Sequence, residues 1–324
     1  MPGRLGLVFP GQGSQYVGMG LDLCAQYSEA RSVFEEADAA LGFGLSKLCF
    51  DGPEEELNDT VNTQPAVLAV SIAALRTVEN LDEVGPVSSV AGHSLGEYTA
   101  LVAAGRLSFG DALRLVRERG RLMKEAGEQR PGGMAAVMGL ATESVEEACA
   151  RAREETTTIV QMANINSPGQ VVISGERKGL ERAITLAQRQ GARRVVTLAV
   201  SIASHSILME SASEGLREAL NSIEFRDSDT PVVGNVTGRP LLDSDAIRDE
   251  LTRQLVSPVQ WVASVLWMIE HGAKTFVEFG PKDTLSKLIK HIDRSVDTVC
   301  IENASTVREW MGSAVHQRAL AGET

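Results

Sequence analysis

Short apolar runs bounded by glycine or proline alternate along this chain with longer segments whose apolar residues recur at helical spacing. The short runs are typical of buried strands, and they lie at 5–11, 87–92, 230–238 and 274–280. The longer segments predict helices at 28–42, 63–80, 94–105, 109–126 and 258–272. This alternation predicts an α/β fold with a mostly parallel sheet.

Residues 131–200 follow a different order. GGMAAVMGL predicts a strand, ESVEEACARARE a helix, and TIVQMANINSPGQVVISG two strands around a turn at Ser167 to Gly169; a helix over KGLERAITLAQRQG and a strand over RRVVTLAV follow. Strand, helix, strand, strand, helix, strand is the order of a ferredoxin-like unit. We therefore expect a catalytic core of residues 1–129 and 200–324, interrupted by a small subdomain of residues 130–199. From about Asn303 the pattern is polar and weakly helical, which predicts a segment packed on the outside.

Composition narrows the classes of protein. The four cysteines, at positions 24, 49, 149 and 300, show no CxxC pair and no His/Cys cluster, so we expect reduced thiols and neither a zinc site nor disulfides. No apolar run is long enough for a signal sequence or a membrane span, which predicts a cytoplasmic protein. The net charge of -12 argues against general affinity for nucleic acid or an anionic membrane.

The stretch VAGHSLGEY at 90–98 carries the first candidate chemistry. Gly92 to Gly96 fits G-x-S-x-G between a predicted strand and a predicted helix, the context of a nucleophile elbow. Glycines at both flanks allow a sharp turn that projects the Ser94 hydroxyl, and the N–H of Leu95 is then placed to meet an oxyanion. The alternative is a tight turn merely capped by serine; the flanking strand and helix favour the elbow.

A serine nucleophile needs a base, and the chain has five histidines. His93 adjoins the serine on the turn, where neighbouring side chains diverge, so it is better suited to lining a pocket. The segments around His271 and His291 predict exposed side chains, and His316 lies in the polar tail. His205, in AVSIASHSILM, lies among small and apolar residues after a predicted strand, which suits a base beside a pocket, although a satisfied core histidine is the commoner case.

Three further features leave alternatives open. No acidic residue stands out as a triad member, so a backbone carbonyl is a possible partner for the histidine. GQGSQ at 11–15 lacks the third glycine of a dinucleotide loop and is either a simple turn or a source of oxyanion-hole amides. Arg119 borders the apolar face of its predicted helix; spacing alone favours a solvated charge, whereas at a pocket edge it would receive a carboxylate.

Together these residues resemble the malonyl-CoA:acyl carrier protein transacylases and, beyond them, the acyltransferases of polyketide synthases. The resemblance covers nearly the whole chain, through FPGQGSQ, NTQPA, GHSLGEY, RGRLM, NINSPGQVVISG, SIASH, NVTG, QLVSPVQW and EFGP in this order. It implies an α/β-hydrolase-like core with an inserted ferredoxin-like subdomain. It also implies transfer of a malonyl group from malonyl-CoA to the phosphopantetheine thiol of an acyl carrier protein through a malonyl-serine intermediate, with no bound cofactor.

The same resemblance assigns roles to individual residues. It makes Ser94 the nucleophile and His205 its base, places the backbone carbonyl of Gln254 behind the imidazole, and forms the oxyanion hole from the backbone amides of Gln12 and Leu95. It makes Arg119 the receptor of the malonyl carboxylate, reversing the interpretation from spacing. His93, Gln64, Asn166 and Ser204 are then expected to line the pocket.

The implied carrier protein is acidic, so a basic rim is needed on this acidic chain. Candidate docking residues are Arg189, Arg193, Arg194, Lys282, Lys287 and Lys290, each of which is equally compatible with a solvated face. We expect a monomer. ASH in SIASH is shared with methylmalonyl-selective polyketide acyltransferases, so that substrate stays an alternative to malonyl. Two further alternatives are a serine hydrolase of acyl thioesters, which has no use for Arg119, and a non-catalytic carrier-binding scaffold.

Overall fold

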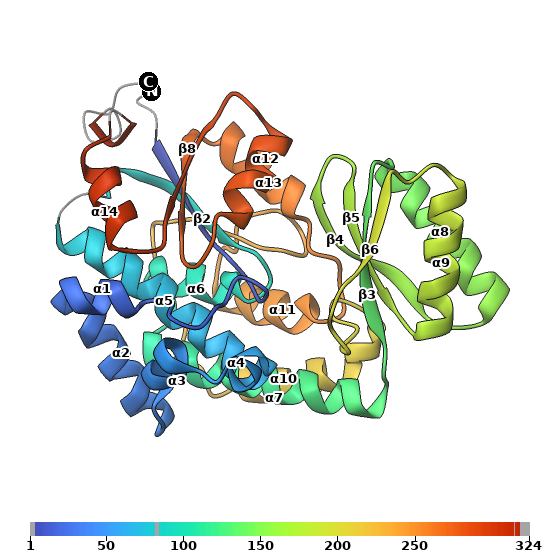
Figure 1. The fold of residues 1–324 in the computed structure, drawn as a ribbon, viewed down its shortest axis with the longest axis horizontal. Coiled ribbons are helices and arrows are strands. Elements are labelled where there is room, and N and C mark those ends of the chain that lie inside the picture. Colours follow the sequence, from blue (N-terminus) through green and yellow to red (C-terminus); the bar gives the residue numbers. More distant parts are fainter. Residues whose placement is uncertain (1–3, 82–83, 314, 318–324) are drawn as a thin grey trace.

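A computed structural model describes residues 4–81, 84–313 and 315–317, and Figure 1 shows their fold. The larger part is built around sheet A, in which five described strands run parallel in the order β7-β2-β1-β8-β9. These strands are β1 (Arg4–Phe9), β2 (Val87–Gly92), β7 (Val232–Val233), β8 (Ala273–Phe279) and β9 (Asp297–Ile301). Because parallel strands share one direction, the loops after β1, β2 and β8 all leave from the same edge of the sheet.

Alternation along β1 explains how sheet A acquires two covered faces. Leu5, Leu7 and Phe9 belong to one apolar cluster, and Val8, which points the other way, belongs to a second. The second cluster is closed by α12 (Trp261–Glu270) and α13 (Thr284–Ile292). The first packs against α1 (Leu21–Gln26), α2 (Ser28–Leu41), α3 (Leu45–Asp51), α4 (Glu54–Asn58), α5 (Thr60–Asn80), α6 (Gly96–Ala103), α7 (Phe109–Gln129), α10 (Glu210–Leu220), α11 (Ser244–Gln254) and α14 (Ala304–Met311).

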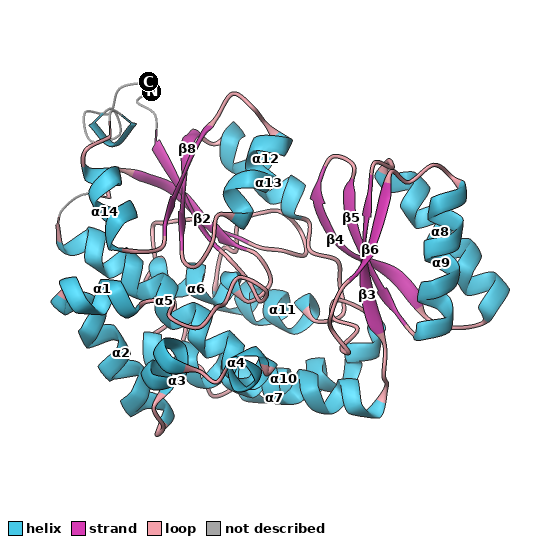
Figure 2. Ribbon diagram, viewed as in Figure 1, coloured by secondary structure: helices cyan, strands magenta, loops and turns pink. Residues whose placement is uncertain are grey.

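Sheet B forms the small subdomain at the right of Figure 2, where two helices cover its outer face. Its strands run antiparallel in the order β4-β5-β3-β6. The elements in chain order are β3 (Gly133–Met138), α8 (Thr142–Thr156), β4 (Val160–Ser167), β5 (Gln170–Gly175), α9 (Arg177–Arg189) and β6 (Arg194–Thr197). This is the predicted ferredoxin-like order, and it lies within the expected 130–199. The expected fold class, a parallel α/β core with an antiparallel subdomain, is confirmed.

Sheet B is tied to the core along β4. The N–H of Ile165 donates to the carbonyl of Val259 at 2.9 Å, and the N–H of Val259 donates to the carbonyl of Ala163 at 2.9 Å. Nearby, the side-chain amide of Gln161 donates to the carbonyl of His205 at 3.2 Å. The subdomain therefore supports the loop that carries the predicted base.

Several predicted boundaries differ from the structure. The run 230–238 forms a strand only at Val232–Val233, because GNVTG turns away to bring Asn235 toward the site described below. The helix predicted from 63 begins earlier, at Thr60, where the Asp59 carboxylate accepts from the N–H of Val61. The elements at 21–26, 45–51, 54–58, 210–220, 244–254, 284–292 and 297–301 were not predicted.

In the described part of the segment after Asn303, α14 lies at the edge of the core with one face exposed and the other buried. Helix α14 buries Val307 and Trp310 in the first apolar cluster, and Trp310 is only 1 % exposed. The helix is nucleated by a capping box between Asn303 and Thr306. His316, expected in a polar tail, is also buried.

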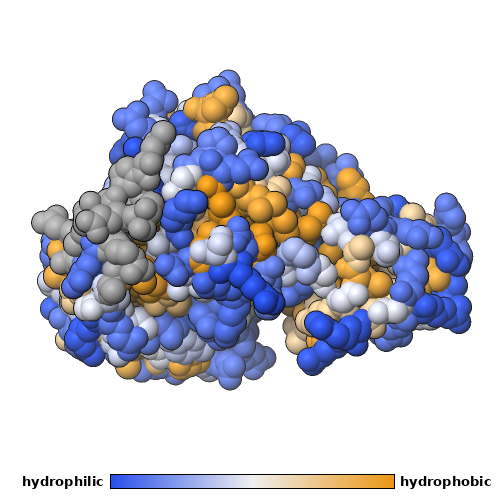
Figure 3. All heavy atoms as spheres, turned by 90° about the horizontal axis from the view of Figure 1, so that it is seen from above, coloured by the Kyte–Doolittle hydropathy of each residue, from blue (hydrophilic) through white to orange (hydrophobic). Residues whose placement is uncertain are grey.

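The surface seen from above has apolar side chains gathered around the middle of the molecule, with hydrophilic residues toward both ends (Figure 3). In the ranges the structure describes, no helix has both the length and the apolar character needed to cross a bilayer.

Candidate active site

The turn between β2 and α6 forces Ser94 into an unusual backbone conformation, with φ of 52°. A Cβ on Gly92 would lie 1.9 Å from the carbonyl of Gly96, and one on Gly96 would lie 2.0 Å from the carbonyl oxygen of Phe9. No side chain fits at either position, so the two glycines are required for the turn to close against β1. The predicted nucleophile elbow is present.

Asn235 holds the elbow from the far side. Its Oδ1 accepts from the Ser94 N–H at 2.7 Å, and its Nδ2 donates to the carbonyl of Gly92 at 2.7 Å. One amide thus satisfies a donor and an acceptor of the strained turn. Sequence analysis quoted NVTG as part of the resemblance but gave Asn235 no role.

His205 bridges the serine and a main-chain carbonyl, as the resemblance implies. Its Nε2 lies 2.8 Å from the Ser94 Oγ, and its Nδ1 lies 2.8 Å from the carbonyl oxygen of Gln254. A carbonyl oxygen only accepts, so Nδ1 carries the proton and Nε2 is left to accept from the serine hydroxyl. The sequence separation of 49 between His205 and Gln254 explains why no local pattern shows this contact.

Burial sets the charge of His205. The ring is almost fully buried, and this burial, together with the positive charge of Arg119, lowers its pKa from 6.5 to about 3. The imidazole is therefore neutral near pH 7, which is the form that removes a proton.

Arg119 is not a solvated charge, so the interpretation from spacing alone is wrong. The side chain is 1 % exposed, and its Nη2 donates to the Ser94 Oγ at 3.1 Å and to the Gln254 Oε1 at 2.8 Å. Its Nη1 donates to the Gln64 Oε1 at 2.8 Å, while its Nε has no partner among the described residues. All its partners come from other elements and none is a carboxylate, which leaves a buried guanidinium beside the nucleophile ready for an anion.

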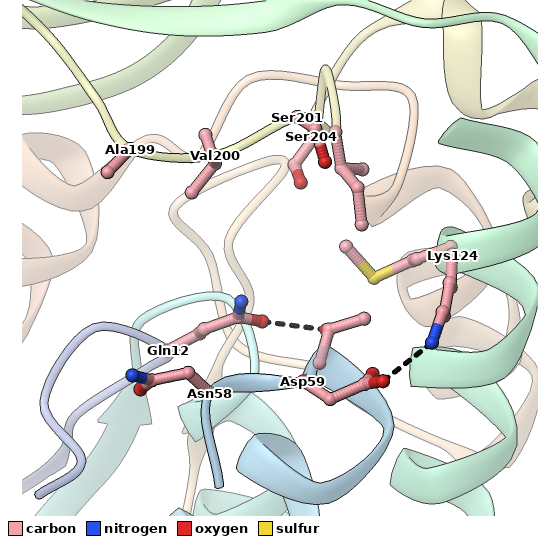
Figure 4. A pocket seen from close by; sticks show the side chains of 11 residues that line it. Gln12, Asn58, Asp59, Lys124, Ala199, Val200, Ser201 and Ser204 are labelled. Carbon is pink, nitrogen blue, oxygen red and sulfur yellow. Dashed lines mark hydrogen bonds and ion pairs between the residues drawn. The ribbon is translucent and has the colours of Figure 1, made fainter. Parts of the chain in front are cut away.

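The two backbone N–H groups that the resemblance assigns to the oxyanion hole have no acceptor among the described residues. Neither Gln12, after β1, nor Leu95, at the start of α6, donates its N–H to any described residue. The Gln12 side chain is held by Thr60, whose hydroxyl donates to the Gln12 Oε1 at 2.8 Å, as Figure 4 shows. Free N–H groups at the end of a strand and at a helix N-terminus suit an oxyanion.

A cavity of about 260 Å³ adjoins this site (Figure 4). It is enclosed by the loop after β6, by α7 and by the start of α5, and Gln12 and Ser204 both line it. Gln64 lies behind it, fully buried, with its Nε2 donating to the Thr60 Oγ1 at 2.9 Å. Gln12 and Ser204 therefore line the cavity, whereas Gln64, which the resemblance places on the pocket wall, is not among the lining residues.

His93 and Asn166 join the two subdomains. The Nε2 of His93 lies 2.8 Å from the Oδ1 of Asn166, at the end of β4, and the His93 ring contacts that of Trp261. Since Oδ1 only accepts, His93 donates. Burial lowers the pKa of His93, which favours its neutral form. Neither His93 nor Asn166 is among the residues that line the cavity described above, where the resemblance places them.

The predicted docking residues lie in two separate regions of the molecule, one on the small subdomain and one around α13. Arg189, Arg193 and Arg194 are exposed on the small subdomain. Lys282 instead donates from its Nζ to the carbonyls of Gly13 and Gln15, at 3.1 and 3.3 Å, and so fastens the loop that carries Gln12. Lys287 forms an ion pair with Asp283 at 2.7 Å, and the Lys290 Nζ donates to the carbonyl of Val296 at 2.5 Å.

Sequence analysis missed two buried carboxyl groups behind the site. Glu97 and Glu250 are almost fully buried, although they come from α6 and α11. The available signal was an acidic residue in GEYTALVA, a helix that is otherwise mostly apolar. Among the described residues, no three His, Cys, Asp or Glu side chains cluster so as to hold a metal ion.

Comparisons with known proteins give matches over nearly the whole chain. The profile of the acyl transferase domain matches residues 7–310. The malonyl CoA-acyl carrier protein transacylase of Escherichia coli (strain K12) is 46 % identical over 296 residues, covering 91 % of this chain and 94 % of the relative. That of Bacillus subtilis (strain 168) is 44 % identical over 305 residues, covering 94 % and 95 %.

A solved structure agrees with these relatives. It contains a malonyl-transacylase in complex with its type II polyketide synthase acyl-carrier protein, and the matched chain is 42 % identical with a TM-score of 0.91. The match covers 95 % of the present chain and 98 % of the other. The likeness therefore extends over both sheets.

Proposed function

The chain belongs to the acyl transferase domain family, and from this premise we propose that it transfers malonyl from malonyl-CoA to an acyl carrier protein through a malonyl ester of Ser94. The two relatives compared above are named for this activity, and each match covers more than 90 % of the chain. The observation that carries the proposal is the contact of one serine hydroxyl with both a neutral imidazole and a buried guanidinium. The first explains acyl transfer, and the second explains an acyl group that ends in a carboxylate.

The first half of the reaction acylates the enzyme. The Ser94 hydroxyl gives its proton to the Nε2 of His205 while its oxygen attacks the thioester carbon of malonyl-CoA. The N–H groups of Gln12 and Leu95 stabilise the negative oxygen of the tetrahedral intermediate. The carbon–sulfur bond then breaks, and the coenzyme A thiolate leaves with a proton from His205.

The second half runs the same steps with a different thiol. The phosphopantetheine thiol of the carrier gives its proton to His205 and attacks the ester carbon. The ester bond breaks, and Ser94 recovers its proton from the imidazolium. The carrier leaves as a malonyl thioester, so atoms and protons balance over the ping-pong cycle.

Arg119 gives the site its preference for a charged acyl group. A carboxylate that takes the second N–H of Nη1, and the Nη2 N–H that donates to Ser94 before acylation, forms charge-assisted hydrogen bonds that a neutral acetyl group cannot form. Burial strengthens these bonds because little water competes. A hydrolase of neutral acyl chains has no use for such a group, which favours malonyl transfer over that alternative.

Substitution of Arg119 tests the specificity. In Arg119→Ala we expect loading with malonyl-CoA to fall by about a hundredfold, because charge-assisted bonds contribute roughly 1.5–3 kcal/mol. Loading with acetyl-CoA should change little. Intact mass of the protein after incubation with each acyl-CoA measures both rates, and Ser94→Ala, which has no nucleophile, is the control.

Two results would contradict the proposal. An unchanged preference in Arg119→Ala removes the carboxylate-binding role. Release of free malonate in place of malonyl carrier, when a carrier protein is present, would identify a hydrolase. Incubation with methylmalonyl-CoA in the same assay tests whether the small Ser204 admits a methyl branch.

A further inference from the structure

The buried carboxylate of Glu97 lies one side chain away from Arg119. Glu97 is 0 % exposed, and both its oxygens accept hydrogen bonds. Oε1 accepts from the backbone N–H of Asn235 at 3.2 Å, and Oε2 accepts from the Nε2 of Gln254 in a short contact. Glu97 lies three positions after Ser94, on the first turn of α6, so the carboxylate is fixed close to the elbow.

Glu97 decides which way the side-chain amide of Gln254 points. The Gln254 Nε2 faces two acceptors, Glu97 and the carbonyl of Ser94, which it reaches at 2.9 Å. Because the Nε2 points toward Glu97, the Oε1 of Gln254 faces Arg119. It accepts a hydrogen bond from the Arg119 Nη2 at 2.8 Å. A reversed amide would set N–H groups against the guanidinium and leave Glu97 facing an oxygen.

Glu250 completes the arrangement from α11. Its carboxyl group is near enough to that of Glu97 for their charges to repel, and its Oε1 accepts from the N–H of Val236 at 2.5 Å. Burial and mutual repulsion raise the pKa of Glu97, and burial raises that of Glu250. Each of the two buried carboxyl groups is therefore harder to ionise than an exposed one. Arg119 itself forms no ion pair among the described residues, and its side-chain partners are the neutral groups of Gln64, Ser94 and Gln254.

We propose that Glu97 is a positioning residue that sets Arg119 for the acyl carboxylate by fixing the amide orientation of Gln254. This inference rests on the proposed function and deepens it. The contacts from Glu97 to Arg119 run through the side chain of Gln254, whereas His205 is held by the main-chain carbonyl of Gln254. Loss of Glu97 therefore disturbs the carboxylate receptor more than the Ser94–His205 pair.

The test compares Glu97→Gln with the wild type in single-turnover loading by malonyl-CoA and by acetyl-CoA, followed by intact mass. The new amide sets an N–H against either Gln254 or Asn235, and the Gln254 side chain must turn to relieve the clash. We expect the malonyl-over-acetyl preference to fall about tenfold while acetyl loading stays within about threefold. Thr99→Val is the matched control, because Thr99 is buried on the same helix and its hydroxyl has no partner among the described residues.

The outcomes separate the two proposals. An unchanged preference in folded Glu97→Gln, or an equal loss with both substrates, overturns the positioning role. Should Glu97→Gln fail to fold, Glu97→Asp decides: it keeps the carboxylate but withdraws it from Gln254, and only a reduced preference supports the inference. No loading of the wild type would refute the proposed function and, with it, this role.

Discussion

At the scale of residues, the site depends on contacts between side chains that are far apart in the sequence. Ser94 and His205 were predicted from composition and local context, because an elbow has a glycine pattern and histidines are few. Arg119 shows the limit of such reasoning. Its helix is rich in charges, and only the buried oxygens of Gln64, Ser94 and Gln254 make its burial possible. No periodicity contains that information, so its role came from the family resemblance.

The depressed pKa of His205 gives a prediction for the pH dependence of loading. A base titrates from its active, neutral form to its inactive, protonated form as pH falls, and a lowered pKa moves this loss to lower pH. We therefore expect kcat/KM for malonyl-CoA to keep its value well below pH 6.5, toward the His205 pKa of about 3. Initial rates of coenzyme A release across this range measure it.

The Arg119→Ala variant tests how much the charge of Arg119 contributes to the lowered pKa of His205. Removing the positive charge raises the pKa of His205, so the acid limb should move to higher pH when acetyl-CoA is the substrate. An acid limb near pH 6.5 in the wild-type enzyme would contradict the burial of a neutral imidazole.

At the scale of elements, the strand, turn and helix around Ser94 are fixed by close approach of backbones. The apolar run 87–92 and the helix after it were predicted well, because glycines mark where one pattern gives way to the other. Short elements such as α4 were missed, since five residues carry too little periodicity. The pattern of α14 is only weakly helical, because its polar residues face outward and few apolar residues, among them Val307 and Trp310, mark the buried face.

Glycine substitutions test the elbow as an element. In Gly92→Ala the new methyl group would lie 1.9 Å from the carbonyl of Gly96, so the turn must open. We expect the free energy of unfolding to fall by about 3 kcal/mol or more, with loss of acyl loading. Denaturant titration measures the first and intact mass the second.

Gly110→Ala is the matched control for this change. An added methyl group there meets only the Arg114 side chain, at 3.6 Å or more, within a helix. We expect a gain of about 0.5–1 kcal/mol and normal loading. Equal stability of both variants would show that the elbow tolerates a side chain.

At the scale of the whole molecule, the site lies where the two subdomains meet. The core supplies Ser94, Arg119 and Gln254, while the small subdomain contributes Asn166 and supports the loop of His205 through Gln161. The order of elements in 131–200 predicted the subdomain from the sequence alone. How it docks was not predictable, because the contacts of Val259 with β4 join segments almost a hundred residues apart.

At this scale we predict that an acidic carrier protein docks on the exposed arginines of the small subdomain. Arg193 and Arg194 are exposed on the small subdomain without an ion pair among the described residues, whereas Lys287 is already paired with Asp283. We expect the double variant Arg193→Glu, Arg194→Glu to lower kcat/KM for the carrier about tenfold, with a smaller effect for Lys287→Glu. Loading by malonyl-CoA, measured without carrier, should be unchanged. Equal transfer rates at low salt would rule out this surface.

The acceptor behind His205 belongs to the peptide chain, and every amino acid brings the same oxygen to position 254. Replacing the Gln254 side chain by alanine removes the hydrogen bond to Arg119 but leaves the backbone carbonyl that contacts His205. An alanine scan would therefore overlook the partner of the imidazole. A neutral carbonyl dipole also raises the basicity of the imidazole less than an anion does, which suits the thioester exchange proposed above, because a thiolate is a good leaving group.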